Sequence, residues 1–314
     1  MKLVVQVPCL NEEQTLPAVL KDIPKKIAGI DEIIIVIIDD GSSDRTVEVA
    51  KQLGVKHFVY HTRNQGLGRS FSDGVDYALS IGADIVVNTD GDNQYPQDRI
   101  GDLVKPILDG NADIVIADRQ THKIAHFSPV KKFLQKLGSK VVNIAAGTDV
   151  PDAVSGFRAY SREALLQLNS ISRFSYCTET IIQAGNKRLA LASIAVDTNP
   201  PLRKSRLFKS TRQHVMKTSA IIIRAYIMYK PQLVFGTLGT ALGLLGLIPI
   251  ARYIYFAVVE DSARGHLQSL IIGSTVLIGS FLCFVLIIIA DLIRTNRILI
   301  ESELEHTKRM RFQR

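Results

Sequence analysis

The sequence predicts an α/β fold with a mostly parallel sheet, followed by interfacial helices and a two-helix transmembrane hairpin. In residues 1–200, short runs rich in Val and Ile alternate with segments of helical periodicity. This pattern is typical of parallel strands whose two faces are covered by helices. After residue 232, two segments of 18 and 24 residues carry no charge. Because a bilayer span needs about 20 apolar residues, these segments predict the hairpin.

The elements expected in the first 200 residues alternate along the chain. Strands are expected at residues 2–8, 32–40, 56–61, 84–90 and 113–119. Helices are expected from near residue 11 to residue 23, at 44–54 and at 68–82. Ligands of such sheets bind beyond the carboxyl ends of the strands, so the residues that follow each strand are the candidates for function.

Polar side chains follow four of these strands. They are Asn11 and Glu12, Asp39 and Asp40, Asp90 and Asp92, and Arg119. Residues 39–44, DDGSSD, would also serve as a turn and a helix cap, but four polar strand ends together indicate a nucleotide-binding cleft. The sequence lacks G-x-G-x-x-G after the first strand and lacks G-x-x-x-x-G-K-[ST]. A dinucleotide dehydrogenase and a P-loop nucleotidase are therefore disfavoured.

Residues 88–96, NTDGDNQYP, place Asp90 and Asp92 on either side of a glycine directly after an apolar run. One interpretation is structural, because Asp and Gly are common turn formers. The other is functional, because paired carboxylates hold a divalent cation that neutralises a diphosphate. We expect the functional interpretation to hold, with the glycine allowing a tight turn.

The two uncharged segments are residues 233–250 and 267–290. Basic residues lie outside the pair on both sides, while the short link between the segments contains Glu260 and Asp261. By the positive-inside rule the catalytic domain and both termini are expected in the cytoplasm, in a protein integral to the plasma membrane. Small residues such as Gly239 and Gly246 fit packing within the hairpin or assembly of subunits, and the sequence does not choose between them.

The basic excess belongs to the last third of the chain. Lys and Arg number 22 against 24 Asp and Glu in residues 1–200, and 16 against 6 in residues 201–314. Because these cations flank apolar segments, they indicate anionic lipid and not nucleic acid as the partner. We expect a soluble domain at 1–205, interfacial helices at 206–231, the transmembrane pair at 232–293 and a basic tail helix at 294–314. An ordinary linker helix is the alternative for residues 206–231.

The three cysteines, Cys9, Cys177 and Cys283, form no C-x-x-C or Cys/His cluster. Neither a zinc site nor a disulfide framework is indicated, and unpaired thiols in a reducing compartment are expected. The N-terminal segment MKLVVQVPCLNEE is too short for a secretory signal, and acidic residues follow its apolar run too soon.

Five motifs in series resemble one known family. They are VPCLNEE, IIDDGSSDRT, NQGLGRSFSDG, NTDGDNQYP and PDAVSGFRAYSREAL. Their order over residues 3–210 resembles the family-2 glycosyltransferases of GT-A fold, and more narrowly the polyprenyl-phosphate sugar synthases. The family includes dolichyl-phosphate mannose synthase and undecaprenyl-phosphate glucosyltransferases. The resemblance implies transfer of a hexose from a UDP-sugar or GDP-mannose to undecaprenyl or dolichyl phosphate, with Mg2+ or Mn2+ as cofactor. It also implies a homo-oligomer, for example a tetramer.

The resemblance also assigns roles to residues. The nucleotide and its phosphates would be lined by Pro8, Asn11, Glu12, Asp39, Asp40, Gly66 and Arg69. Metal ligands would be Asp90, Asp92 and Gln94. The sugar or the acceptor phosphate would meet Arg119, Asp152, Ser155 and Arg158, and a basic acceptor segment would contain Arg203, Ser205 and Arg206. Asp92, Asp152 and Arg158 are the expected catalytic residues.

The chemistry favours arginine over histidine in this site. A lipid phosphate is already ionised near neutral pH, so it needs positioning and charge compensation, which planar guanidinium groups provide. The histidines, His61 among them, are expected in surface or structural roles. The alternative activities are transfer to another membrane acceptor, such as a glycolipid or a polysaccharide, and a membrane scaffold with a degenerate transferase domain. The absence of tryptophan excludes the Q-x-x-R-W motif of processive synthases.

Overall fold

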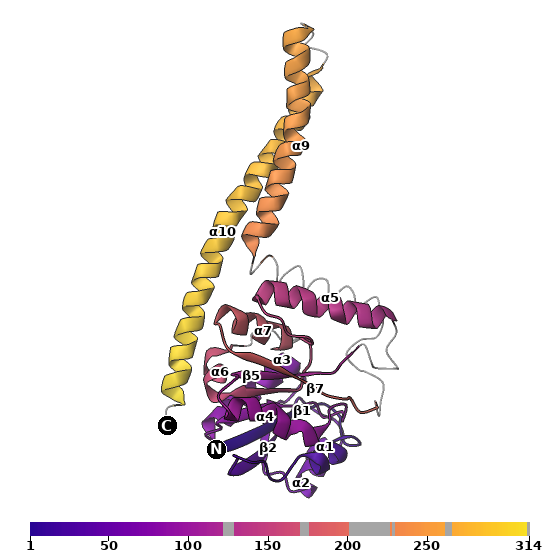
Figure 1. Cartoon of the computed structure of the whole chain (residues 1–314), viewed down its shortest axis with the longest axis vertical. Helices are drawn as coiled ribbons and strands as arrows, with labels where there is room; N and C mark the ends of the chain where they lie inside the picture. The colour runs from indigo at the N-terminus through magenta and orange to yellow at the C-terminus, as the bar shows by residue number, and fades with distance from the viewer. Residues whose placement is uncertain (122–128, 170–175, 201–226, 228–229, 261–265, 313–314) are drawn as a thin grey trace. The chain divides into compact units, whose positions relative to one another are not determined.

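The computed structural model describes residues 1–121, 129–169, 176–200, 227, 230–260 and 266–312. The chain forms two compact units, which we describe separately (Figure 1). The first consists of Met1–Thr218 together with Glu301–Arg314, and the second is Ser219–Ile300. The chain therefore leaves the first unit once and returns to it near its end.

The first unit is built on a seven-stranded sheet with the order β3-β2-β1-β4-β6-β5-β7. Its strands are β1 (Lys2–Cys9), β2 (Glu32–Asp39), β3 (His57–Tyr60), β4 (Ile85–Asn88), β5 (Ile114–Asp118), β6 (Arg158–Ser161) and β7 (Leu191–Ala195). All neighbouring pairs are parallel except those of β6, which runs antiparallel to β4 and to β5. The mostly parallel sheet expected from the sequence is confirmed.

Helices cover both faces of this sheet (Figure 1). They are α1 (Leu16–Asp22), α2 (Thr46–Gln52), α3 (Leu67–Ser80), the 3-10 turn η1 (Gln97–Arg99), α4 (Ile100–Leu108), α5 (Pro129–Ala146), α6 (Arg162–Gln167) and α7 (Tyr176–Asn186). Alternate residues of β1 point to opposite faces. Val5 packs in one hydrophobic core with Val19 of α1 and Leu103 of α4, whereas Gln6 lies against Gly74 of α3.

The sequence expectation missed strands β6 and β7 and the helices from α4 to α7, and it began the first helix too early. The first helix begins at Leu16 and not near Asn11, because Asn11 has a left-handed backbone, with φ of 56°, and the following residues form a turn. Strand β6 was not expected. It has four residues and starts with a fully buried arginine, Arg158, so it lacks the apolar run that marks the other strands.

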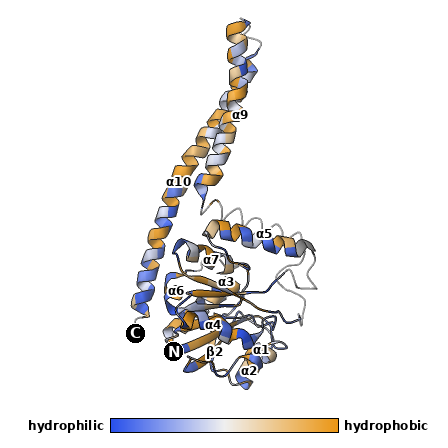
Figure 2. Ribbon diagram, viewed as in Figure 1, coloured by the Kyte–Doolittle hydropathy of each residue, from blue (hydrophilic) through white to orange (hydrophobic). Residues whose placement is uncertain are grey.

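The second unit contains helix α9 (Pro231–Val259) and most of α10 (Leu267–Arg311). By length and composition both helices could cross a membrane, and Figure 2 shows their apolar surface. Gly239 and Gly246 face α10: Ser280 Oγ donates a hydrogen bond of 2.7 Å to the Gly239 carbonyl, and a Cβ on Gly246 would lie 3.1 Å from the Gly273 carbonyl oxygen. These small residues therefore serve packing within the hairpin.

Candidate active site

The site lies at the carboxyl edge of β1, β2 and β4. These strands are parallel neighbours, with Cys9 beside Asp39 and Gln6 beside Asn88, so the residues that follow them meet at one edge. Asn11 Oδ1 accepts a hydrogen bond of 2.7 Å from the Ser43 amide. This contact joins the loop after β1 to the loop after β2.

The turn Asp90–Gly91–Asp92 follows β4 and carries the two candidate metal ligands, so we call it the metal turn. It is held by residues that follow β1. Thr15 Oγ1 lies 2.7 Å from the Gly91 carbonyl oxygen and 2.7 Å from Glu12 Oε2, so its one proton is shared between these two acceptors. A Cβ on Gly91 would lie 3.1 Å from Cys9 Sγ, and Gly91 is not among the glycines with positive φ. The glycine is therefore required by its close approach to the end of β1, and not by the tight turn that we expected.

Gln94 orients one carboxylate of this turn. Its backbone amide donates to Asp92 Oδ1 at 3.2 Å, and its side-chain Nε2 donates to Asp92 Oδ2 at 2.9 Å. Hard oxygen ligands are those that Mg2+ and Mn2+ prefer. Within the described residues, no group of three or more His, Cys, Asp or Glu side chains is arranged to hold a metal ion. Two carboxylates and an amide fit a cation whose remaining ligands come from a bound diphosphate, so this donor set suits such a metal.

Asp40 acts on a loop of the protein itself. Its Oδ1 accepts a hydrogen bond from the Gln65 amide at 2.8 Å, and its Oδ2 accepts one from the Gly66 amide at 3.0 Å. His61 Nδ1 lies 2.7 Å from the same Oδ1, while its Nε2 lies 3.1 Å from Asp73 Oδ2. Asp40 is 5% exposed. Asp40 therefore shapes the turn before α3, and its expected contact with the nucleotide stays a prediction.

The first turn of α3 lies next to this network. Gly66 has φ of 93°, a conformation that L side chains rarely adopt. Arg69 Nε donates to Asp73 Oδ2 at 2.7 Å, and the Arg69 side chain is 59% exposed. The Gly66 amide is already bonded to Asp40, and the expected phosphate contacts of Gly66 and Arg69 stay predictions.

Arg119 and Asp152 form a buried ion pair across two strand ends. Arg119 Nε donates to Asp152 Oδ2 at 2.7 Å and Nη2 donates to Oδ1 at 2.9 Å. The side chains are 15% and 4% exposed. Burial lowers the pKa of Arg119, but the neighbouring Tyr95 and Asp152 outweigh burial and leave the pKa above its usual value. Both oxygens of Asp152 accept from a guanidinium, so this carboxylate is not placed as a general base.

Arg158 does not face the cleft. Its guanidinium donates to the carbonyls of Ser155, Cys177 and Ala153 at 2.7, 2.9 and 2.8 Å and to Thr180 Oγ1 at 2.9 Å. It is 0% exposed. These donors hold the protein backbone, so Arg158 has a structural role, and its expected catalytic role stays a prediction. The Ser155 hydroxyl is also buried, and it has no hydrogen-bond partner within the described part of the chain.

A family model described as glycosyl transferase family 2 matches residues 4–168, more than half of the chain. The chain belongs to glycosyl transferase family 2. The enzyme is 29% identical over 213 residues to UDP-N-acetylglucosamine–dolichyl-phosphate N-acetylglucosaminyltransferase of Methanococcus voltae, which covers 61% of this chain and 83% of the relative. It is 26% identical over 182 residues to polyprenol monophosphomannose synthase of Mycolicibacterium smegmatis, with coverage of 55% and 67%.

A solved structure supports the same fold for this glycosyltransferase. Glucosyl-3-phosphoglycerate synthase from Mycobacterium tuberculosis, in complex with Mn2+, UDP-glucose and phosphoglyceric acid, superposes with a TM-score of 0.55 at 22% identity. The match covers 72% of this chain and 78% of the synthase. This likeness shows the fold, which is the GT-A fold that the resemblance implied.

A buried polar network behind the metal turn of the glycosyltransferase was missed by sequence reasoning. Asn88 Nδ2 donates to the Gly156 carbonyl at 3.0 Å and to Tyr176 Oη at 2.6 Å, and Asn88 Oδ1 accepts from Gln6 at 3.0 Å. Tyr95 Oη accepts from the Gly156 amide at 2.9 Å. The loop that contains Gly156 is thus tied to the residues on both sides of Asp90 and Asp92. Asn88 and Tyr95 stand in the NTDGDNQYP motif, but their roles depend on partners more than 60 residues away.

Burial also removes one thiol of the glycosyltransferase from consideration as a nucleophile. Cys9 lies under the metal turn, and burial, followed by the charges of Glu12 and Asp39, raises its pKa well above the usual value. A thiol needs a lowered pKa to react as a thiolate near neutral pH. Cys9 therefore packs as a neutral side chain.

Almost all of the expected interfacial segment lies outside the described residues, and so do Arg203, Ser205 and Arg206.

A cavity of about 560 Å³ lies away from the candidate site, along the 147–151 turn, the end of α7 and the start of β7. It includes neither aspartate of the metal turn, so the side-chain chemistry, and not the size of a hollow, identifies the site.

Proposed function

We propose that the enzyme transfers a hexose from a nucleotide-diphosphate sugar to a polyprenyl phosphate at the cytoplasmic face of a membrane, in a metal-dependent reaction that inverts the anomeric centre. The observation that carries the proposal is the turn Asp90–Gly91–Asp92, held at the carboxyl edge of a parallel sheet by Thr15. One of the relatives compared above is named for the transfer of N-acetylglucosamine to dolichyl phosphate. The other is named as a synthase of polyprenol monophosphomannose.

The residues of the metal turn bind and orient the donor in this proposal. Asp90, Asp92 and Gln94 would hold Mg2+ or Mn2+, which supplies charge compensation for the departing diphosphate. Asn11, Glu12 and Asp39 lie at the same sheet edge and flank the space for the nucleotide. The acceptor phosphate is already an anion and attacks without a strong base. This agrees with the pairing of Asp152 to Arg119.

The apolar part of the chain supports a lipid acceptor. Helices α9 and α10 could cross a membrane by length and composition. The first unit contains the candidate site, and we call it the catalytic unit. Its helix α5 exposes apolar side chains, of which Phe133 is 65% exposed and Ile144 41% exposed. Lys136 and Lys140 are exposed on the same helix. Apolar side chains flanked by lysines are typical of a helix that lies at the interface with anionic lipid.

The test uses the full-length protein purified in detergent. We expect nucleotide-sugar turnover to require both polyprenyl phosphate and Mg2+ or Mn2+, and to fall at least about 100-fold in Asp90→Asn and Asp92→Asn, on the scale of lost electrostatic stabilisation in a transition state. Asp98→Asn is the matched control, because Asp98 is exposed on the adjacent 3-10 turn. Turnover undiminished in either metal-turn variant, or in chelator-treated protein, would refute the proposal.

The choice of acceptor is tested in the same assay. Sugar transfer to a glycolipid or an oligosaccharide in the absence of polyprenyl phosphate would identify the alternative membrane acceptor. Product of retained anomeric configuration would exclude direct displacement.

A further inference from the structure

The last turns of α10 belong to the catalytic unit, because the chain returns to that unit at Glu301. The residues that meet the unit are Glu305, Lys308, Arg309 and Phe312. They recur at intervals of three and four, so they share one face of the helix. Phe312 is 7% exposed, and its carbonyl accepts a hydrogen bond from Arg162 of α6. The basic tail is therefore a packed helix end.

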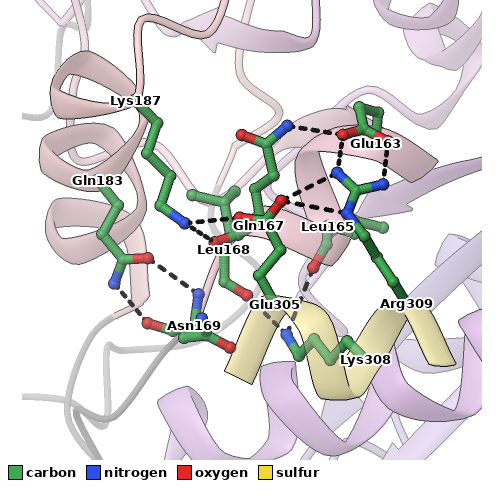
Figure 3. A network of polar contacts seen from close by, with 10 residues as sticks. All are labelled: Glu163, Leu165, Gln167, Leu168, Asn169, Gln183, Lys187, Glu305, Lys308 and Arg309. Carbon is green, nitrogen blue, oxygen red and sulfur yellow. Dashed lines mark hydrogen bonds and ion pairs between the residues drawn. The ribbon is translucent and has the colours of Figure 1, made fainter. Parts of the chain in front are cut away.

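Lys308 closes the end of α6. Its Nζ donates to the Leu168 carbonyl at 2.6 Å and lies 3.4 Å from the Leu165 carbonyl (Figure 3). The last carbonyls of a helix have no partner within the helix, and a cation placed there also interacts favourably with the helix dipole. Burial lowers the pKa of Lys308, while the nearby Asp76 acts against this effect.

Arg309 and Glu305 form a charge network with the catalytic unit. The Arg309 guanidinium donates to both carboxylate oxygens of Glu163, one of them at 3.0 Å, and to Glu305 (Figure 3). Lys187 Nζ donates to the Gln167 carbonyl at 2.7 Å and lies 3.3 Å from Glu305 Oε2. The hydrogen bond from Arg309 is the main cause that lowers the pKa of Glu163. Glu305 and Arg309 of the tail thus each meet an opposite charge on the domain, Lys187 and Glu163 respectively.

The surface that receives the tail is fixed by bonds of its own. Gln183 of α7 accepts from the Asn169 amide at 2.9 Å and donates to the Asn169 carbonyl at 2.5 Å. Ser161 Oγ caps the start of α6 by accepting from the Ala164 amide at 3.1 Å. Hydrogen bonds within the catalytic unit therefore hold the segment that contains Glu163 and Leu168. Lys308 and Arg309 of the tail supply the cations that meet the Leu168 carbonyl and the Glu163 carboxylate.

We infer that the α6–α7 surface of the catalytic unit is a docking site for the chain's own C-terminal helix. We call this surface, formed by Arg162, Glu163, Lys187 and the carbonyls of Leu165 and Leu168, the tail socket. The helix between Glu301 and Phe312 is its ligand, and the decisive contacts are those of Lys308 and Arg309. The inference is independent of the proposed sugar transfer.

Docking changes the meaning of the basic C-terminus. The sequence places Lys308 and Arg309 only among the basic residues that follow the second uncharged segment, whereas in the structure both cations bond the protein. Helix α10 runs from Leu267 to Arg311, and its residues from Glu301 onward belong to the catalytic unit. The chain therefore joins the catalytic unit to the second unit twice, once before residue 219 and once after residue 300.

The test is a charge exchange in the full-length protein in detergent, followed by hydrogen exchange of peptides that cover 162–168 and 301–312. Glu163→Arg and Arg309→Glu should each speed exchange in both peptides by at least about threefold, and the double variant should restore most of the protection, as expected for two residues in direct contact. Glu303→Arg is the control, since Glu303 is an exposed residue of the same helix, and it should leave both peptides unchanged. Unchanged exchange in both single variants, or a double variant no better protected than the singles, would overturn the inference.

A second measurement decides whether the tail occupies the socket of its own chain. Glu163→Cys and Arg309→Cys are combined and linked with a short bis-maleimide. The three native cysteines are buried and should not react in the folded protein. A linked product with the mass of one chain supports the inference, whereas a covalent dimer would overturn it by showing that the tail enters a neighbouring copy.

Discussion

The buried guanidinium of Arg158 offers the sharpest test of how the catalytic unit is built. Arg158→Met keeps a long side chain but removes the donors to three carbonyls, those of Ser155, Cys177 and Ala153, and to the Thr180 hydroxyl. Each buried acceptor left without a donor costs about 1–3 kcal/mol, whereas removal of a buried charge returns several kcal/mol of desolvation. We expect the balance to lower the free energy of unfolding by about 4 kcal/mol.

The assay for Arg158→Met is thermal unfolding without any ligand. For a unit of this size about 4 kcal/mol corresponds to a Tm lower by roughly 8–16 °C. Since the chain has no tryptophan, circular dichroism at the helix band is the appropriate signal. Arg99→Met is the matched control, because Arg99 pairs with Asp102 at the surface, and its Tm should move by less than 2 °C, or roughly 0.5 kcal/mol. An Arg158→Met protein of normal Tm that no longer transfers sugar would show that Arg158 touches a substrate, and the structural interpretation would be wrong.

Three further predictions concern other parts of the catalytic unit. His61→Phe removes the ring nitrogens that lie between two carboxylates, so the loop before α3 loosens and the KM for the nucleotide sugar rises about tenfold, a loss of roughly 1.4 kcal/mol; an equal rise in the KM for the acceptor would contradict this. Gly185→Ala places a Cβ 2.1 Å from the Ala146 carbonyl oxygen and should destabilise the unit by about 1–3 kcal/mol in urea unfolding, whereas Gly138→Ala, where the space is open, should not destabilise it. The pKa of Glu163 is lowered in the folded protein, so its contribution to stability is present above the unfolded value of about 4.3 and is lost as the pH falls through the folded value. The difference in Tm between the wild type and Glu163→Gln should therefore be constant above about pH 5 and shrink as the pH falls below about 4.3, and a difference that stays constant down to acid unfolding would count against it.

The strands that the sequence predicts are those with a strong local signal. Runs such as EIIIVIID in β2 are buried along most of their length, and their Val and Ile side chains favour a sheet covered on both faces. Strand β6 could not be predicted in this way, because its four residues begin with Arg158. It becomes a strand only through pairing with β4 and β5, which lie more than 40 residues earlier in the chain. Its antiparallel direction is a property of the tertiary fold.

The candidate site divides along the same line. Asp90 and Asp92 follow a strand directly, and the position of a strand end is readable from local sequence. The direction of a charged side chain is not. Asp40 and Arg158 stand in motifs as informative as the metal turn, yet one bonds the loop before α3 and the other bonds backbone carbonyls. A motif shows that a residue is needed, but its contacts decide whether the need is chemical or structural.

The charges that remain for the acceptor follow from this division. Arg158 donates to the protein, and Arg119 already neutralises Asp152 through two hydrogen bonds. An anionic acceptor that approaches this pair meets a net charge near zero, so Arg119 compensates a phosphate fully only if Asp152 gives up its bonds. The family resemblance also assigns Arg203 and Arg206 to the acceptor, and both lie outside the described residues. We therefore predict that the cation beside a lipid phosphate comes from these two arginines rather than from Arg119 or Arg158.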